Sequence, residues 1–163
     1  MKSLFQYIKE SLAVNEGHSA GDIKLFWKWI EALGGEEFMQ ENYSHYQKTR
    51  EEDFAYNKIA DLGTTARQFK TFTDIFFEMA EKALDLMYEE DDAFGGDDSM
   101  QYGSWSCPFA GEKEFLKMMK DSSRVISFAA NYQYQGEIAG YIFEPEDYED
   151  YLKKNKLNPG GFR

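Results

Sequence analysis

The chain has 163 residues and a formal net charge of −12, with 42% hydrophobic and 17% aromatic residues. This composition is far from that of disordered chains, and the length predicts a single globular domain over residues 1–163. Most of the negative charge lies in residues 51–100, which hold fourteen acidic and four basic side chains. Because such a field repels phosphate groups and anionic lipids, the composition argues against direct nucleic-acid binding and against membrane binding.

The cysteine content and the first residues bear on where the protein resides. Cys107 is the one cysteine, so the chain cannot form an internal disulfide. The start of the sequence has no uninterrupted apolar run of the kind found in secretory signals, and no segment has the length and hydropathy needed to cross a bilayer. These features predict a cytoplasmic protein.

The first predicted element is an amphipathic helix over residues 1–13. Ser3 and Gln6 have the spacing of a capping box, and the apolar residues that follow recur at helical intervals. These apolar residues are Leu4, Phe5, Ile8 and Leu12.

A second helix is predicted to have Asp22 as its N-cap and to end at Gly34 and Gly35. Trp29 lies off the apolar face of that helix, so we expect it either to pack against another element or to be exposed at an interface. Residues 36–60 are more polar and are also predicted to be helical.

The strongest helical pattern runs from Thr65 to Tyr88 and predicts the central core helix. Thr65 and Gln68 again have capping-box spacing. The apolar residues alternate spacings of three and four and form one stripe. The stripe consists of Phe69, Phe72, Phe76, Met79, Ala83 and Leu86.

The last third of the chain is predicted to be mixed. Residues 99–111 are expected to be irregular, and a short helix is expected over 112–120. The stretch "RVISFAANYQYQGEIAGYIF" has β-branched and aromatic residues on both sides of Gln135-Gly136, which favours an antiparallel β-hairpin, although residues 124–134 also fit a helix face.

The end of the chain completes the predicted fold. Pro145 is expected to begin a short helix whose Tyr148, Tyr151 and Leu152 dock onto the small sheet. Residues 157–163 are expected to form a loose tail. The predicted fold class is therefore α+β and mainly α, with a helical N-terminal two-thirds, a small hairpin and a short C-terminal helix.

The most unusual stretch is "YEEDDAFGGDD", residues 88–98, which holds six acidic residues and no basic one. It does not match an EF-hand loop, because only the first ligand position and the glycine agree. A different cation site is an alternative, with Asp91, Asp92, Asp97 and Asp98 as its weak candidate ligands. A solvated turn and a surface for a basic protein partner are the other two interpretations.

No catalytic residue is predicted, and the sequence leaves open whether the protein is an enzyme. Cys107 has no histidine close in sequence to activate it, and the two histidines with one cysteine lack the paired spacing of a zinc site. The glycine pairs are not followed by phosphate-binding motifs, so no cofactor is predicted.

Two local resemblances accompany these patterns. "MKSLFQYIKES", residues 1–11, resembles the head-targeting starts of internal proteins of T-even-type phages, which implies packaging into a prohead. The stretch "VISFAANYQYQGEIAGYIFEPEDYEDYL" resembles the hairpin and final helix of SUKH-type immunity domains, which implies neutralisation of a toxin. Both imply an accessory or conflict-related protein.

The sequence predicts a non-catalytic acidic interaction protein that binds a basic protein partner, of the inhibitor, immunity or nucleic-acid-mimic type. Alternatives are a phage internal or assembly protein with a head-targeting helix, and a carboxylate metal-binding protein or enzyme. The predicted partner-binding residues are Asp85, Glu89, Glu90, Asp91, Asp92, Phe94, Asp97, Asp98, Tyr102 and Trp105. The sequence does not define the partner or the oligomeric state.

Overall fold

The structure, a computed structural model, describes residues 18–51, 53–90 and 95–163. The predicted helix over residues 1–13 lies outside these ranges. All regular elements of the described residues are helical: α2 (Ala20–Leu33), α3 (Glu36–Thr49), α4 (Asp53–Asp61), α5 (Ala66–Tyr88), α6 (Asp97–Ser106), the 3-10 turn η1 (Cys107–Ala110), α7 (Glu112–Met118), α8 (Ser122–Tyr141) and α9 (Pro145–Lys154).

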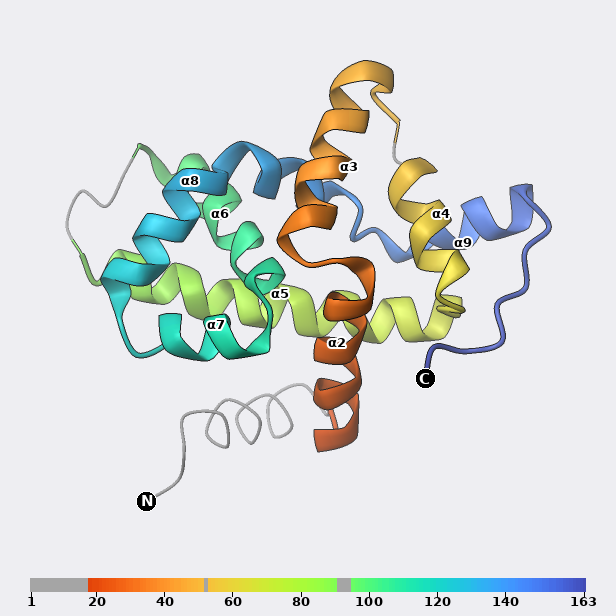
Figure 1. The fold of residues 1–163 in the computed structure, drawn as a ribbon, viewed down its shortest axis with the longest axis horizontal. Helices are drawn as coiled ribbons and strands as arrows, with labels where there is room; N and C mark the ends of the chain where they lie inside the picture. Colours follow the sequence, from red (N-terminus) through yellow and green to blue (C-terminus); the bar gives the residue numbers. More distant parts are fainter. Residues whose placement is uncertain (1–17, 52, 91–94) are drawn as a thin grey trace.

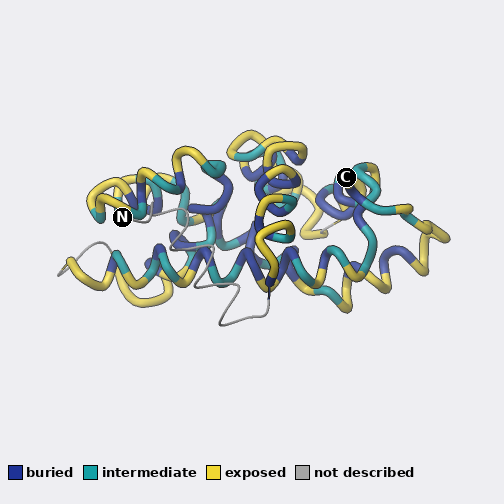
Figure 2. Tube along the Cα trace, turned by 90° about the horizontal axis from the view of Figure 1, so that it is seen from below, coloured by how far each residue is buried: buried dark blue, intermediate teal, exposed yellow. Residues whose placement is uncertain are grey.

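Helix α5 runs along most of the long axis of the molecule, and α2, α6, η1, α8 and α9 pack against it (Figure 1). Its predicted stripe faces the core, where Phe69 and Phe76 stack on Phe143 from the end of α8. Figure 2 shows that buried and exposed positions alternate along the helices, as expected for amphipathic helices around one core.

The helix ends follow local capping chemistry. Thr65 and Gln68 form the predicted capping box at the start of α5. At the start of α2, however, the N-cap is Ser19, and Asp22 is the N3 residue that completes its capping box, so the predicted boundary was three residues late. Gly34 ends α2 in the left-handed conformation, with φ of 117°.

The predicted β-hairpin is wrong, because α8 is helical from Ser122 to Tyr141, with a kink at Tyr132, and no described residue is in a strand. Gly136 was interpreted as a turn residue, but it lies where α8 crosses α6. A Cβ atom on Gly136 would come within 2.2 Å of the Tyr102 carbonyl oxygen, and one on Gly140 within 2.2 Å of the Trp105 ring. These glycines therefore allow two helices to approach closely.

Two further corrections follow from this arrangement. Residues 99–111, predicted to be irregular, form most of α6 and η1, which pack against α8 and α5. Helix α9 begins at Pro145 as predicted, but it docks onto α4 and α5 and not onto a sheet.

Trp29 packs within the core, which confirms the first of its two predicted environments. Its side chain is 0% exposed, and its Nε1 donates a hydrogen bond to Thr64 Oγ1 at 3.0 Å. The hydroxyl of Tyr148 donates to the Thr64 carbonyl oxygen at 2.6 Å. Thr64 thus satisfies two polar groups that would otherwise be buried without partners.

The predicted loose tail, residues 157–163, has no regular secondary structure but is anchored near its end. Phe162 is buried and lies against Phe72. Its backbone N–H donates to Gln68 Oε1 at 2.8 Å, and Gln68 Nε2 donates to its carbonyl oxygen at 2.9 Å. The N–H of Gly161 donates to the Gly63 carbonyl oxygen at 2.8 Å. The tail is therefore tied to the start of α5.

Among the described helices, none combines the length and the apolar character that a membrane span requires.

Candidate partner-binding surface

The described part of the predicted acidic site lies at one end of the molecule, where α5 ends and α6 begins (left in Figure 1). We call this region the acidic end and define it by the exposed residues Asp85, Glu89, Glu90, Asp97 and Asp98. Asp91, Asp92 and Phe94 lie outside the described residues.

The acidic end is joined to the start of α8. Ser122 Oγ donates a hydrogen bond to Glu90 Oε1 at 2.8 Å. Close by in sequence, Asp121 Oδ2 lies 3.8 Å from Arg124 Nε, and Asp121 Oδ1 accepts from the Ser123 hydroxyl at 2.6 Å. The hydrogen bond from Ser123 is the largest cause that lowers the pKa of Asp121, followed by backbone hydrogen bonds and the charge of Arg124. Asp121 is therefore ionised at neutral pH.

Asp97 and Asp98 have a structural role as well as a charge. They occupy the first turn of α6, whose N-cap Gly96 provides no side-chain hydrogen bond. Carboxylates in a first turn interact favourably with the helix dipole by about 0.3–1 kcal/mol each. Any test that removes these charges must therefore allow for a loss of stability.

The two predicted aromatic residues, Tyr102 and Trp105, follow Asp98 on α6 at spacings of four and three. They therefore lie on the same side of the helix as Asp98. Both are partly exposed, and their ring centroids are 5.3 Å apart. The structure thus brings Asp98, Tyr102 and Trp105 together along one helix.

Helix α8 adds two residues to this group that the sequence interpretation missed. Tyr141 lies 6.4 Å from Trp105 between ring centroids, and its hydroxyl donates to Glu137 Oε1 at 2.7 Å. The hydrogen bond to Glu137 is the main cause that raises the pKa of Tyr141, with burial second. We call Tyr102, Trp105, Glu137 and Tyr141 the aromatic cluster. A helical interpretation of residues 133–141 would have identified the pair, because Glu137 and Tyr141 are one turn apart.

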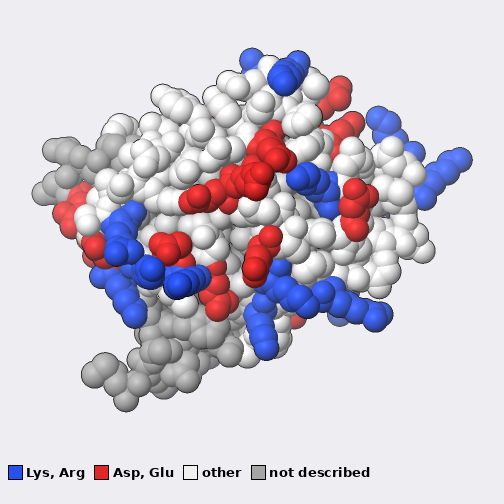
Figure 3. All heavy atoms as spheres, in the orientation of Figure 1, with Lys and Arg blue, Asp and Glu red and all other residues white. Residues whose placement is uncertain are grey.

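The face of the molecule seen in Figure 1 has a different charge distribution. Figure 3 shows acidic and basic side chains interspersed across it. The charge asymmetry of the sequence therefore does not make every face of the protein acidic.

The side chains that bear on catalytic and metal chemistry are Cys107, the histidines and the carboxylates. Burial raises the pKa of the Cys107 thiol to about 12, so this thiol is protonated at neutral pH. His45 stacks on Phe54 with ring centroids 4.0 Å apart. Within the described ranges, no three His, Cys, Asp or Glu side chains are grouped so that they could hold a metal ion.

Comparisons with known proteins do not assign this chain to a class: no family model, no curated protein and no solved structure matches it significantly. The resemblance to SUKH-type immunity domains depended on a predicted hairpin, and the corresponding residues form α8 instead. The stretch that resembles phage head-targeting sequences lies outside the described residues.

Proposed function

We propose that this chain is a non-catalytic interaction protein that binds a basic protein partner through the acidic end and the adjoining aromatic cluster. The observation that carries the proposal is the stripe on α6, where Asp98, Tyr102 and Trp105 present a carboxylate beside two partly exposed rings.

The charges of the acidic end are accessible to a partner. Its carboxylates are exposed, and the ion pairs of Lys58, Lys117, Arg124 and Lys153 use other carboxylates. Exposed charges of one sign accelerate association with an oppositely charged surface and set its orientation. The acidic end would therefore attract and orient the partner more than it would hold it.

The aromatic cluster supplies the apolar contact that the acidic end lacks. Trp105 is fixed from three sides, by Phe77 on α5, by Tyr102 on α6 and by the close approach of Gly140 on α8. Rings that are held before binding lose little conformational entropy in a complex, and tryptophan and tyrosine are enriched among the residues that dominate binding energy.

The proposal is tested by capturing partners from lysate with three forms of the protein. The first variant carries Asp85→Asn, Glu89→Gln, Asp97→Asn and Asp98→Asn, which changes the net charge from −12 to −8. We expect it to capture the basic partner on the order of tenfold less efficiently, because steering and orientation are weakened.

The second variant, Tyr102→Ala, is expected to lose about 2 kcal/mol of binding free energy if the ring lies at the centre of the interface.

A matched control removes the same number of charges elsewhere. Glu51→Gln, Glu146→Gln, Asp147→Asn and Asp150→Asn are exposed changes, and two of them fall in the first turn of α9 just as Asp97 and Asp98 fall in the first turn of α6. The control should capture the partner like the parent protein. Equal losses in both quadruple variants would show that only net charge matters and would contradict a defined site.

A further inference from the structure

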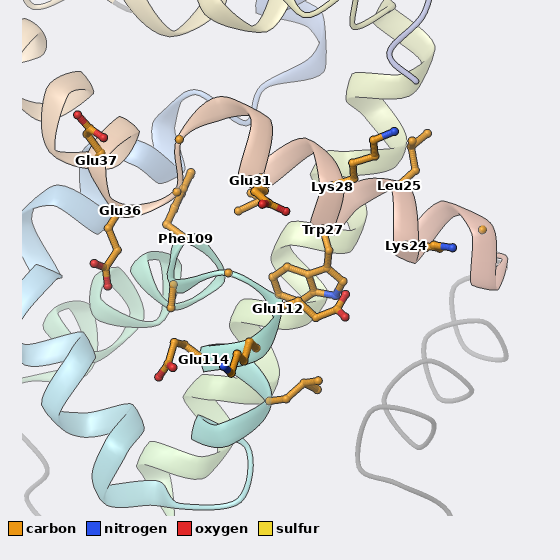
Figure 4. A pocket seen from close by; sticks show the side chains of 18 residues that line it. Lys24, Leu25, Trp27, Lys28, Glu31, Glu36, Glu37, Phe109, Glu112 and Glu114 are labelled. Carbon is orange, nitrogen blue, oxygen red and sulfur yellow. The ribbon is translucent and has the colours of Figure 1, made fainter.

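The groove between α2 and the segment formed by η1 and α7 has no preference for one sign of charge (Figure 4). It has a volume of about 1260 Å³ and an apolar floor that includes the buried Trp27 and Phe109. In the described lining of this groove, Lys24, Lys28 and Lys113 lie among five glutamates. Because both signs are present, the groove does not select a basic side chain over an acidic one.

The two helices that form the aromatic cluster carry a different set of charges. Helix α6 contains no lysine or arginine, and α8 contains none after Arg124, which lies in its first turn. The charged residues of α6 and of this later part of α8 are all acidic: Asp97, Asp98 and Glu137. These two helices therefore contribute only negative charge around the cluster.

Helix α5, the third helix at the cluster, adds two carboxylates. Its Phe77 lies 5.9 Å from Trp105 between ring centroids. Asp74 and Glu81, three residues before and four residues after Phe77, are exposed and lie on the same side of α5. Lys70 is one turn beyond Asp74 and is therefore farther along the helix from Trp105. The potential at the cluster is therefore negative, which favours a cationic ligand.

The carboxylate of Glu137 can accept hydrogen bonds from such a ligand. Its Oε1 accepts one hydrogen bond, from the Tyr141 hydroxyl at 2.7 Å. Among the described residues, no lysine or arginine forms an ion pair with Glu137. A carboxylate offers about four acceptor positions, so the Glu137 group has capacity for a further donor.

The chemistry of the cluster matches a guanidinium group. A metal ion does not match, because the described residues contain no group of three acidic, histidine or cysteine side chains that could hold one. A guanidinium is planar, packs against aromatic rings and donates paired hydrogen bonds to a carboxylate. An ammonium group is a compact and strongly hydrated charge without a flat surface, so it uses the rings less well.

We propose that the aromatic cluster binds an arginine side chain of the basic partner, with the guanidinium paired to Glu137 and packed against the rings of Tyr102 and Trp105. The site deepens the proposed function, on which it rests, by naming the side chain that the partner presents. The carboxylates of Asp74, Glu81 and Asp98 attract the arginine, and Glu137 holds it beside rings that are already in place.

The experiment titrates the full chain with N-acetyl-L-arginine amide and follows the NMR signals of the indole N–H groups. We expect the Trp105 signal to shift and to saturate. Trp27 is buried, and Trp29 is completely buried with its Nε1 bonded to Thr64, so their signals should stay in place. N-acetyl-L-citrulline amide, which has a similar shape and no charge, should move none of the three. N-acetyl-L-lysine amide should bind Trp105 more weakly than the arginine probe.

Three variants test the role of Glu137. Glu137→Gln keeps an oxygen that can accept from Tyr141 but removes the charge, and we expect the affinity for the arginine probe to fall on the order of tenfold. Tyr141→Phe removes the hydrogen bond and keeps the Glu137 charge, so it should bind the probe like the parent. Glu31→Gln, at an exposed position of α2, is the matched control for the loss of one charge and should also bind like the parent.

Three results would overturn the proposal. The first is a Trp105 signal that does not respond to the arginine probe, and the second is an equal response to the arginine and citrulline probes. The third is an equal loss of affinity in Tyr141→Phe and Glu137→Gln, because Glu137 would then act only by holding Tyr141.

Failure of this site is distinguishable from failure of the proposed function. A chain that captures a basic partner from lysate, but whose Trp105 signal ignores the arginine probe, retains the proposed function and contradicts the arginine site. A chain that binds the probe at Trp105 but captures no basic protein supports the arginine site and contradicts the proposed function.

Discussion

At the scale of single residues, Gly136 and Gly140 determine how the aromatic cluster is assembled. Both lie on the side of α8 that faces α6, where a side chain would collide with the Tyr102 backbone or with the Trp105 ring. A glycine inside a helix costs about 1 kcal/mol relative to alanine, so the close contact between α6 and α8 must offset that cost.

Replacing either glycine by alanine should therefore destabilise the fold despite the better helix propensity of alanine. We expect the free energy of unfolding to fall by about 1–3 kcal/mol for Gly136→Ala and for Gly140→Ala, because the added methyl group forces the helices or the Trp105 ring to move. Urea denaturation measures the change. Gly160→Ala, where no atom lies within 4 Å of the added Cβ, is the control and should change stability little. An unchanged midpoint for Gly136→Ala would contradict the close packing of α6 on α8.

At the scale of elements, Gln68 joins two parts of the chain that are distant in sequence. Its Oε1 accepts hydrogen bonds from the backbone N–H groups of Thr65 and Phe162, and its Nε2 donates to the Phe162 carbonyl oxygen. The residue therefore completes the cap of α5 and holds the tail in place.

Gln68→Ala should weaken both functions, whereas Thr65→Ala should weaken only the cap. We expect about 1 kcal/mol of destabilisation for Thr65→Ala, and a larger loss for Gln68→Ala because three hydrogen bonds are removed. Hydrogen exchange separates the two effects: the Phe162 amide should lose protection in Gln68→Ala and keep it in Thr65→Ala. If the Phe162 amide is equally protected in both variants, Gln68 does not hold the tail.

The sequence predicted those elements whose periodicity and caps agree. The stripe of α5 and the Thr65–Gln68 box both indicate the same helix, and Pro145 marks the start of α9. Helix α8 was misinterpreted because its β-branched and aromatic residues favour a strand, and because a glycine such as Gly136 is typical both of a turn and of a close contact between two helices. The contact with α6 decides between these two roles, and the local sequence does not reveal that contact.

The sequence shows which residues the candidate site contains, but it does not show how they are arranged. The charge of the acidic end and the aromatic character of Tyr102 and Trp105 are visible in the sequence, but their shared face depends on α6 being a helix. Glu137 and Tyr141 join them through the contact between α6 and α8, which is determined by tertiary packing and not by sequence proximity.

At the scale of the whole molecule, several phenol and thiol groups stabilise the fold only in their neutral forms. Tyr148 is completely buried and donates a hydrogen bond to the Thr64 carbonyl oxygen, and burial is the main cause that raises its pKa. Burial also raises the pKa of Tyr151 and brings that of Cys107 to about 12. These groups lose protons more readily in the unfolded chain than in the folded one.

The protein should therefore lose stability at alkaline pH. The contribution of Tyr148 is complete below the ordinary tyrosine pKa of about 10, and it is lost as the pH rises above that value toward the higher pKa of the folded state. Melting temperatures measured between neutral pH and pH 12 should fall steeply in the parent and less steeply in Tyr148→Phe. Tyr134→Phe, at a position 63% exposed, should follow the parent. Parallel curves for all three proteins would contradict this account.

The uneven distribution of charge over the whole molecule is the basis of the proposed function. The most direct test is the salt dependence of the dissociation constant for the captured partner, measured for the parent and for the variant neutralised at Asp85, Glu89, Asp97 and Asp98. We predict that affinity for the parent falls as salt rises, and that the variant binds more weakly with a shallower salt dependence. Equal affinities and equal slopes for the two proteins would show that the acidic end is not the contact surface.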